Sequence, residues 1–295
     1  MPKIIVSKYN TVRFYRYQRD FPEKYLFRYF DKYIVRDNKL SFQDSTLWRQ
    51  PWQNNDIIKI QIQADIPDFK LCLYNCERKK VFESNFEERE TNWKEEGMEV
   101  YESSIDLSSI LEDEYYIAIT YLNWPFYISD PIEVSSNFEN TMFFEYSNRK
   151  NKGSVAFDTE IVFGLRCPAV LQDFQPQSDD TIYIDQNRNT TLLDSVPFST
   201  WKLIVGDAYG VPDYIAQNLN FVFSLSDVKI DGRFFSKVDQ AKFQRTGNRL
   251  YQLAGWEIEV IESEESNDLI NDQINVPAVY GFDKTVYEEG GILLT

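Results

Sequence analysis

The stretch Ile57-Ile-Lys-Ile-Gln-Ile-Gln63 alternates apolar and polar side chains with a period of two residues. This alternation is typical of a half-buried β-strand, because successive side chains of a strand point to opposite faces of its sheet. Similar strand signals follow at residues 69–74, 100–107, 114–121 and 126–134, the last with Pro131 at an edge position or a bulge. Short strands separated by turns in this way predict an immunoglobulin-like β-sandwich over residues 51–135, with an exposed acidic loop at 84–99.

A second β-rich domain is predicted over residues 136–262. One short helix is expected there, because Pro212 precedes Ile215, Leu219 and Val222 at helical spacing. Asp231-Gly232 lies between alternating runs and predicts a β-hairpin, and further strands are predicted at residues 140–146, 160–165, 200–205 and 253–261. The chain is therefore expected to be mainly β, with an N-terminal immunoglobulin-like sandwich, a second β-rich domain with one short helix, and extended termini.

Both ends of the chain lie outside these two predicted domains. Residues 1–50 form a basic, aromatic segment whose interleaved rings and cations suit stacking on nucleic acid or on a neighbouring subunit. The same pattern also fits a pair of strands whose alternate rings pack inward. Residues 263–295 form an acidic tail with too little apolar periodicity for its own core, which predicts an arm on a neighbouring molecule or a loose terminus.

The charge of the chain is unevenly distributed. The net charge is −16, yet residues 1–40 hold ten Lys and Arg against four acids, and residues 251–295 hold ten acids against one lysine. Opposed ends of this kind favour attraction between copies of the chain, although the charges also fit an ordinary solvated surface. The global acidity argues against nonspecific nucleic-acid binding and leaves open only a local contact by residues 1–40.

The cysteines Cys72, Cys76 and Cys167 are expected to be buried free thiols. Strand positions four residues apart are too distant for a disulfide, and a zinc site would need further ligands. Free thiols fit assembly in a reducing cytoplasm. The sequence shows neither the apolar stretch of a signal peptide nor a run long enough for a membrane span, so no membrane partner is expected.

The chain contains no histidine, which excludes Ser-His-Asp and Cys-His catalytic groups by composition. It also lacks a P-loop, a G-x-G-x-x-G run and EF-hand spacing. We therefore predict no catalytic, cofactor-binding or metal-binding residues, no cofactor and no enzymatic activity. Residues 178–185 offer oxygen ligands for a hard cation, but Asp pairs of this kind are also common turn formers.

A carbohydrate site is the main alternative that the composition suggests. A glycosidase needs two carboxylates and often an aromatic platform, and Trp93, Trp124, Trp201 and Trp256 lie near acids in the sequence. Because the chain holds 47 acids, such proximity carries little information. A sugar-binding module is better supported than a hydrolase, and rings in cores or interfaces explain the same residues.

Several short stretches of the second predicted domain carry a family resemblance: Asn140-Thr-Met-Phe-Phe-Glu-Tyr-Ser147, Ser178-Asp-Asp-Thr181 with Asp185-Gln186, Gly210-Val-Pro-Asp-Tyr214, Ile230-Asp-Gly232 and Ala254-Gly-Trp-Glu-Ile-Glu259. Upstream, Tyr115-Tyr-Ile-Ala-Ile119 and Ser129-Asp-Pro-Ile-Glu-Val134 look like the closing strands of the immunoglobulin-like domain beside it. Over residues 51–262 the chain resembles virion structural proteins of tailed phages of Bacteroidetes, crAss-like phages included. The resemblance implies a neck, tail-ring or baseplate component present in many copies around an axis, without catalytic residues.

Together these observations predict a non-enzymatic structural subunit of a bacteriophage virion, assembled in the cytoplasm of the bacterial host. The subunit is expected to form a cyclic ring in the neck, tail or baseplate through contacts with its own copies and with other tail or neck proteins of the virion. The alternative is a carbohydrate-binding or glycan-cleaving module of a phage appendage.

Overall fold

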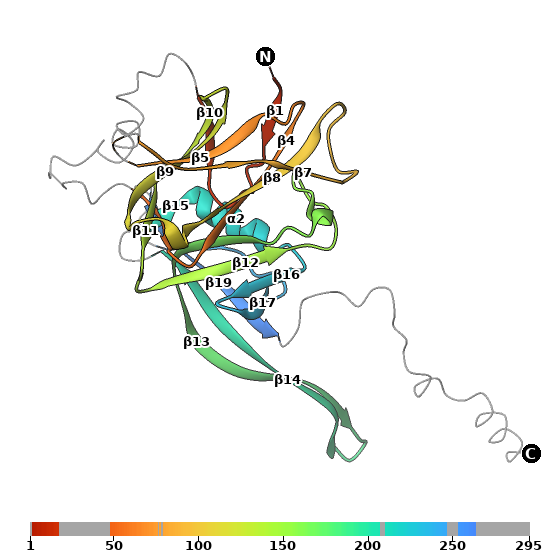
Figure 1. The fold of residues 1–295 in the computed structure, drawn as a ribbon. Helices are drawn as coiled ribbons and strands as arrows, with labels where there is room; N and C mark the ends of the chain where they lie inside the picture. The colour runs from red at the N-terminus through yellow and green to blue at the C-terminus, as the bar shows by residue number, and fades with distance from the viewer. Residues whose placement is uncertain are drawn as a thin grey trace, which may run out of the picture.

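The computed structural model describes residues 2–17, 48–75, 77, 79–206, 210–246 and 253–263. These residues form a mainly β protein with three sheets, as the sequence predicts. Helix α2 (Asp213–Val222) is the only α-helix among them. In Figure 1 a β-sandwich lies at one end, a barrel follows, and a long hairpin leaves the barrel at the other end.

Two sheets form the sandwich. The first has the order β1 (Ile4–Val6), β4 (Ile57–Ala64), β8 (Glu99–Asp106) and β7 (Glu87–Arg89). The second has the order β2 (Phe14–Arg16), β10 (Trp124–Ser129), β9 (Asp113–Tyr121), β11 (Ile132–Ser135) and β3 (Gln50–Gln53), with β5 (Phe69–Asn75) on the other side of β9 and β6 (Lys80–Asn85) beyond it. Side chains of both sheets meet in one core, so the strands β1 and β2 from residues 1–50 extend the predicted sandwich.

Strand β4 shows why the alternating pattern folds in this way. Ile58, Ile60 and Ile62 point into the sandwich core and are at most 2% exposed. Gln61 and Gln63, on the opposite face, are also buried. Gln61 meets Ala156 of the second domain, so a face that alternation predicts to be solvated is instead a contact between domains.

The third sheet closes into a barrel. Its strands pair in the order β12 (Thr141–Ser147), β13 (Phe163–Ile184), β14 (Thr190–Val205), β19 (Leu253–Ser263), β17 (Arg233–Lys237) and β16 (Asp227–Ile230), and β16 returns to β12. Two short strands, β15 (Val211–Pro212) and β18 (Gln244–Thr246), also pair with β19. Closure removes the open edges that a flat sheet would present to other chains.

Helix α2 covers the barrel core through Ile215, Leu219 and Val222, the residues whose spacing predicts the helix. They pack in one cluster with inward-facing barrel residues such as Phe163 and Leu203. Two 3-10 turns, η2 (Leu107–Ser109) and η3 (Phe157–Thr159), complete the described elements.

Local turn chemistry explains several other elements. Asp231 and Gly232 have φ angles of +48° and +82°, as a two-residue type I′ turn requires, and they join β16 to β17. Pro131 ends the pairing of β10 with β2, and β11 then pairs with β3. Cys72 and Cys167 are buried free thiols as expected, whereas Cys76 lies outside the described residues.

Two sequence-based expectations are wrong. The stretch 84–99 is not one continuous loop, because β7 pairs with β8 within it. Residues 166–199 carry no strand prediction, yet they form most of β13 and the distal part of β14, the longest strands among the described residues. The hydrophobic pattern does not predict these strands, because side chains on both faces of the hairpin are exposed and apolar and polar residues therefore do not alternate cleanly.

Candidate functional site: the projecting hairpin arm

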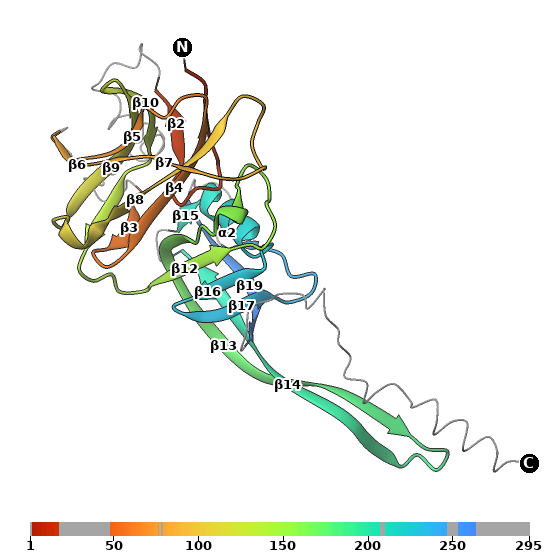
Figure 2. The same cartoon turned by 45° about the vertical axis from the view of Figure 1, so that its right-hand side comes forward.

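The hairpin of β13 and β14 continues far beyond the barrel. We call residues 172–198 the arm. Every residue from 172 to 197 is solvent-exposed except Asp185 in the turn, which is half-buried. At about 3.3 Å per residue a strand of this length reaches roughly 40 Å. Both ribbon views show the arm leading away from the sandwich and the barrel (Figures 1 and 2).

Within the described part of the chain, both edges of the arm are open. Strand β13 pairs with β12 only from Phe163 to Pro168, inside the barrel. Strand β14 pairs with β19 only from Ser199 to Val205. Beyond these points the two strands pair only with each other among the described residues. Two-stranded ribbons are marginally stable in water, and open edges invite pairing with another chain.

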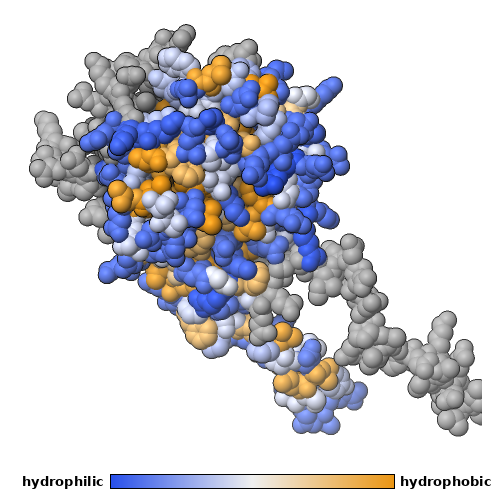
Figure 3. All heavy atoms as spheres, in the orientation of Figure 1, coloured by the Kyte–Doolittle hydropathy of each residue, from blue (hydrophilic) through white to orange (hydrophobic). Residues whose placement is uncertain are grey.

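Large apolar side chains lie on both faces of the arm. Ile182 and Leu192 are directly paired and share one face, whereas Tyr183 and Val196 point to the other. Exposure reaches 61% at Ile184 and 64% at Leu193, in the region of the tip. The exposed apolar residues of the arm are Phe174, Ile182, Tyr183, Ile184, Leu192, Leu193 and Val196. Figure 3 shows apolar atoms gathered near the free end of the arm. Clusters of this kind mark interaction sites when they lie on a stable scaffold.

The tip is a well-formed turn. Asp185 Oδ1 accepts hydrogen bonds from the backbone amides of Asn187 and Asn189, and Asp185 Oδ2 accepts one from Asn189 Nδ2. Hydrogen bonds from the Asn189 side chain and backbone lower the pKa of the Asp185 carboxyl below its usual range. Arg188 has a φ of +65°, which lets the chain reverse direction. The tip therefore presents its apolar residues on a defined backbone.

The arm is acidic. It holds five acids, Asp173, Asp179, Asp180, Asp185 and Asp194, against the single base Arg188. The stretch 178–185 considered above as a source of cation ligands lies mostly in β13, where Asp179 and Asp180 point to opposite faces. Asp180 accepts a hydrogen bond of 2.6 Å from Ser195, which lowers the pKa of its carboxyl. In the described part of the chain, no group of three or more acids or cysteines is placed to hold a metal ion.

A bulge turns the root of the arm against the barrel. Register shifts between Gln172 and Gln175, so Phe174 meets Trp201 at a centroid distance of 4.8 Å. A pocket of about 570 Å³ lies beside this root, and it is lined by Pro197, Phe198, Ser199, Gly232, Arg233, Phe234, Glu262 and Ser263. Its one acid, Glu262, is already bound to Arg233 and to the indole of Trp201. The pocket therefore lacks the pair of carboxylates that glycoside hydrolysis needs.

A buried ion pair fixes the strand that becomes the arm. Arg166, on β13, donates to both carboxylate oxygens of Asp56 in the sandwich at 2.7 and 2.9 Å. The two side chains are only 8% and 4% exposed. The Arg166 guanidinium also lies 5.2 Å from the Phe143 ring and donates to Thr141. The direction of β13 is therefore set relative to the sandwich as well as to the barrel.

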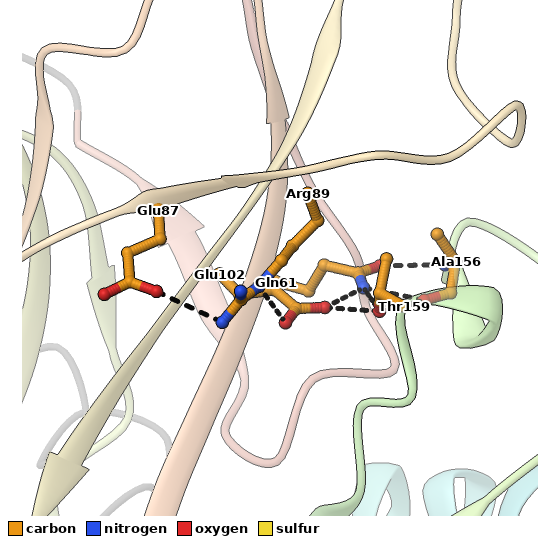
Figure 4. Close-up of polar contacts among 6 residues, drawn as sticks. All are labelled: Gln61, Glu87, Arg89, Glu102, Ala156 and Thr159. Atoms are coloured by element: carbon orange, nitrogen blue, oxygen red, sulfur yellow. Dashed lines mark hydrogen bonds and ion pairs between the residues drawn. The ribbon is translucent and has the colours of Figure 1, made fainter.

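A second polar cluster joins the two domains (Figure 4). Gln61 Nε2 donates to the Ala156 carbonyl and to Glu102, while Gln61 Oε1 accepts from the Ala156 amide. Thr159 donates to Glu102 at 2.6 Å, and Glu102 also binds Arg89 on β7. Because buried polar groups are costly when unpaired, this satisfied network favours one relative placement of sandwich and barrel.

The tryptophans highlighted by the sequence are distributed over several places. Trp93 donates to the Gly153 carbonyl, and Trp124 is exposed at the β9–β10 turn. Trp201 and Trp256 pack against the barrel core. The basic segment 1–50 is described for residues 2–17, where Phe14 packs on the sandwich core, and for residues 48–50. Residues 18–47 of this segment, and all of the acidic tail 263–295 except Ser263, lie outside the described residues. The arm carries no strand prediction, and its best signal in the sequence is the turn Asp185-Gln-Asn-Arg-Asn189 between two β-branched stretches.

Comparison of the chain with protein-family models, curated proteins and solved structures finds no match. Among the described residues, no helix has the length and apolar character that crossing a membrane requires.

Proposed function

We propose that this chain is a non-enzymatic structural subunit that binds other protein through its arm. The observation that carries the proposal is a rigidly rooted β-hairpin with two open edges and apolar side chains on both faces. The resemblance described above gives the setting, a ring in the neck, tail or baseplate of a phage virion. A cyclic ring suits an arm of this kind, because a projecting element meets a different surface on the next subunit.

The energetics favour many weak contacts over one strong contact. Burying an aliphatic side chain contributes about 1.5–3 kcal/mol, so Ile182, Ile184 and Leu192 together contribute roughly 5–9 kcal/mol. Association costs about 4–15 kcal/mol before any contact forms. One arm therefore gives a weak complex by itself. In a closed ring each subunit gives one arm and receives another, so the contacts reinforce one another.

The test is a pair of substitutions at the tip in the full-length chain. Ile182→Ser/Leu192→Ser removes apolar area from a part of the hairpin that touches neither core, so the melting temperature should stay close to that of the unchanged protein. We expect assembly, measured by sedimentation velocity and by incorporation into virions, to fall at least tenfold. Leu111→Ser is the matched control, because Leu111 is 80% exposed and lies outside the arm.

Two results would overturn the proposal. One is a tip variant that assembles as well as the unchanged chain. The other is a chain that is monomeric, absent from virions and able to bind or cleave polysaccharide with the arm substitutions in place. The second result would favour the carbohydrate alternative.

A further inference from the structure

Asp130 carries a buried carboxyl group at the place where the sandwich meets helix α2. It lies between β10 and β11, and only 3% of the residue is exposed. Its Oδ2 atom accepts a long hydrogen bond of 3.4 Å from the Tyr15 hydroxyl, whereas its buried Oδ1 atom has no hydrogen-bond partner among the described residues. Because an unpaired polar atom is costly in a protein interior, this oxygen needs an explanation other than packing.

Helix α2 reaches the same carboxyl group through Tyr214. The indole of Trp48, which lies just before β3, donates a hydrogen bond of 3.0 Å to the Tyr214 hydroxyl oxygen. The Tyr214 proton is therefore left to donate to Asp130, and this hydrogen bond favours the ionised carboxyl. Asp130 thus connects the sandwich to α2 through a group that can gain or lose a proton.

The cation that faces this carboxyl is Arg13. The Asp130 amide donates to the Arg13 carbonyl at 3.0 Å, which continues the register of β2 with β10 by one pair. Directly opposite residues have Cβ atoms about 4.5–5.5 Å apart, so the long Arg13 side chain can reach the carboxyl. Its guanidinium instead lies over the rings of Tyr15 and Tyr214, at 4.9 and 5.1 Å from their centroids.

We infer that Asp130 and Arg13 form a pH-operated contact between the sandwich and helix α2, which goes beyond the proposed function and needs no partner molecule. With the carboxyl protonated, the Arg13 guanidinium stays over the two tyrosine rings, in the arrangement that the structure shows. When the carboxyl ionises, the guanidinium turns toward Oδ1 and pairs with it. The exchange gives up cation–π contacts and supplies the counter-charge that a buried carboxylate requires.

The charges around Asp130 place this exchange near neutral pH. Burial brings the pKa of the carboxyl to about 6, although Tyr214, Arg13 and Tyr15 act in the opposite direction. These three side chains are the titratable and charged groups that face it from β2 and α2. Burial raises the pKa of Tyr214 well above its usual range, and a guanidinium stays charged, so both keep their charge state while Asp130 titrates.

NMR of the full-length chain with isotope-labelled tryptophan tests the inference. The Trp48 indole donates to Tyr214 and therefore reports on the hydrogen bonds of Asp130, and the variant Trp48→Phe assigns its signal. We expect this signal to shift with a midpoint near pH 6. The Trp93 indole, which donates to the Gly153 carbonyl, is the internal reference and should not shift over the same range. Asp130→Asn should abolish the Trp48 titration.

The variant Arg13→Met tests the role of the cation. Removing the charge that favours ionisation should raise the midpoint by about half a pH unit, a threefold change in proton affinity. The matched control is Arg16→Met, which removes an exposed cation nearby on β2 and should leave the midpoint unchanged. A circular dichroism melt confirms that each variant folds.

Crystal structures of one crystal form at about pH 5 and about pH 7.5 test the movement itself. The Arg13 guanidinium should lie over the tyrosine rings at the lower pH and within ion-pair distance of Asp130 Oδ1 at the higher pH. A guanidinium that stays over the rings at both values overturns the inference. So does a Trp48 signal that fails to titrate, one that still titrates in Asp130→Asn, or a midpoint that Arg13→Met leaves unchanged.

Discussion

Replacing Asp56 by Asn should destabilise the whole molecule far more than a substitution at an exposed ion pair does. Asp56 and Arg166 are 4% and 8% exposed and share two short hydrogen bonds, so the substitution leaves a buried guanidinium without its counter-charge. Breaking a buried pair in this way costs about 3–5 kcal/mol. Total stability of folded domains is only about 5–15 kcal/mol, and the loss corresponds to a fall in Tm on the order of 10 °C.

The matched control is Glu83→Gln, which breaks the surface ion pairs of Glu83 with Lys70 and Lys80. The side chains of Lys70, Lys80 and Glu83 are 42%, 40% and 28% exposed, and each such pair contributes about 0–1 kcal/mol. Urea unfolding followed by tryptophan fluorescence measures both variants. The double variant Asp56→Asn/Arg166→Met should be more stable than Asp56→Asn alone, because it removes the stranded charge. Equal losses for Asp56→Asn and Glu83→Gln would refute the reasoning.

Three further outcomes are expected. Burial raises the pKa of the Asp130 carboxyl to about 6, although the Tyr214 and Tyr15 hydroxyls and the Arg13 charge act in the opposite direction. Between about pH 4 and 6 unfolding therefore releases a proton, so the free energy of unfolding should fall by about 3 kcal/mol as the pH rises through that window. Asp130→Asn should flatten this part of the curve of stability against pH. Gly210→Ala should lower the stability measured by thermal unfolding by at least about 3 kcal/mol, because the added Cβ would lie 2.6 Å from the Ala254 backbone at a φ of +81°. Gly232→Ala is the control and should cost only about 1–2 kcal/mol, because the Cβ added there meets no atom within 4 Å. Amides of the arm should exchange hydrogen much faster than those of β14 inside the barrel in the monomer, and become protected on assembly; equal exchange in both states would contradict arm docking.

The elements that the sequence predicts are those with local signals. Strand β4 follows its alternating isoleucines, α2 follows the spacing of Ile215, Leu219 and Val222, and the β16–β17 turn follows Asp231-Gly232. Each signal lies within a few residues, where side-chain period or turn conformation decides the outcome.

The features that the sequence does not predict depend on distant partners. Barrel closure requires β14 to pair with β19, and the central ion pair joins positions 110 residues apart. The projection of the arm from the barrel is not predicted either, because it also depends on which distant strands pair with it. Its strands have turn and β-branched signals, but only the absence of described neighbours distinguishes a projecting hairpin from a buried one.

Stability and assembly should therefore respond to different residues. A hairpin serving only as a loose tether would gain nothing from a root fixed by a buried charge pair, since a tether works through length and flexibility. Here Arg166 lies on the strand that becomes the arm, six residues before it begins, and binds the opposite domain. Substitutions at this root should change both the melting temperature and the geometry of assembly. Substitutions at the tip, such as Ile182→Ser, should change assembly alone, and that separation distinguishes a directed arm from a passive extension.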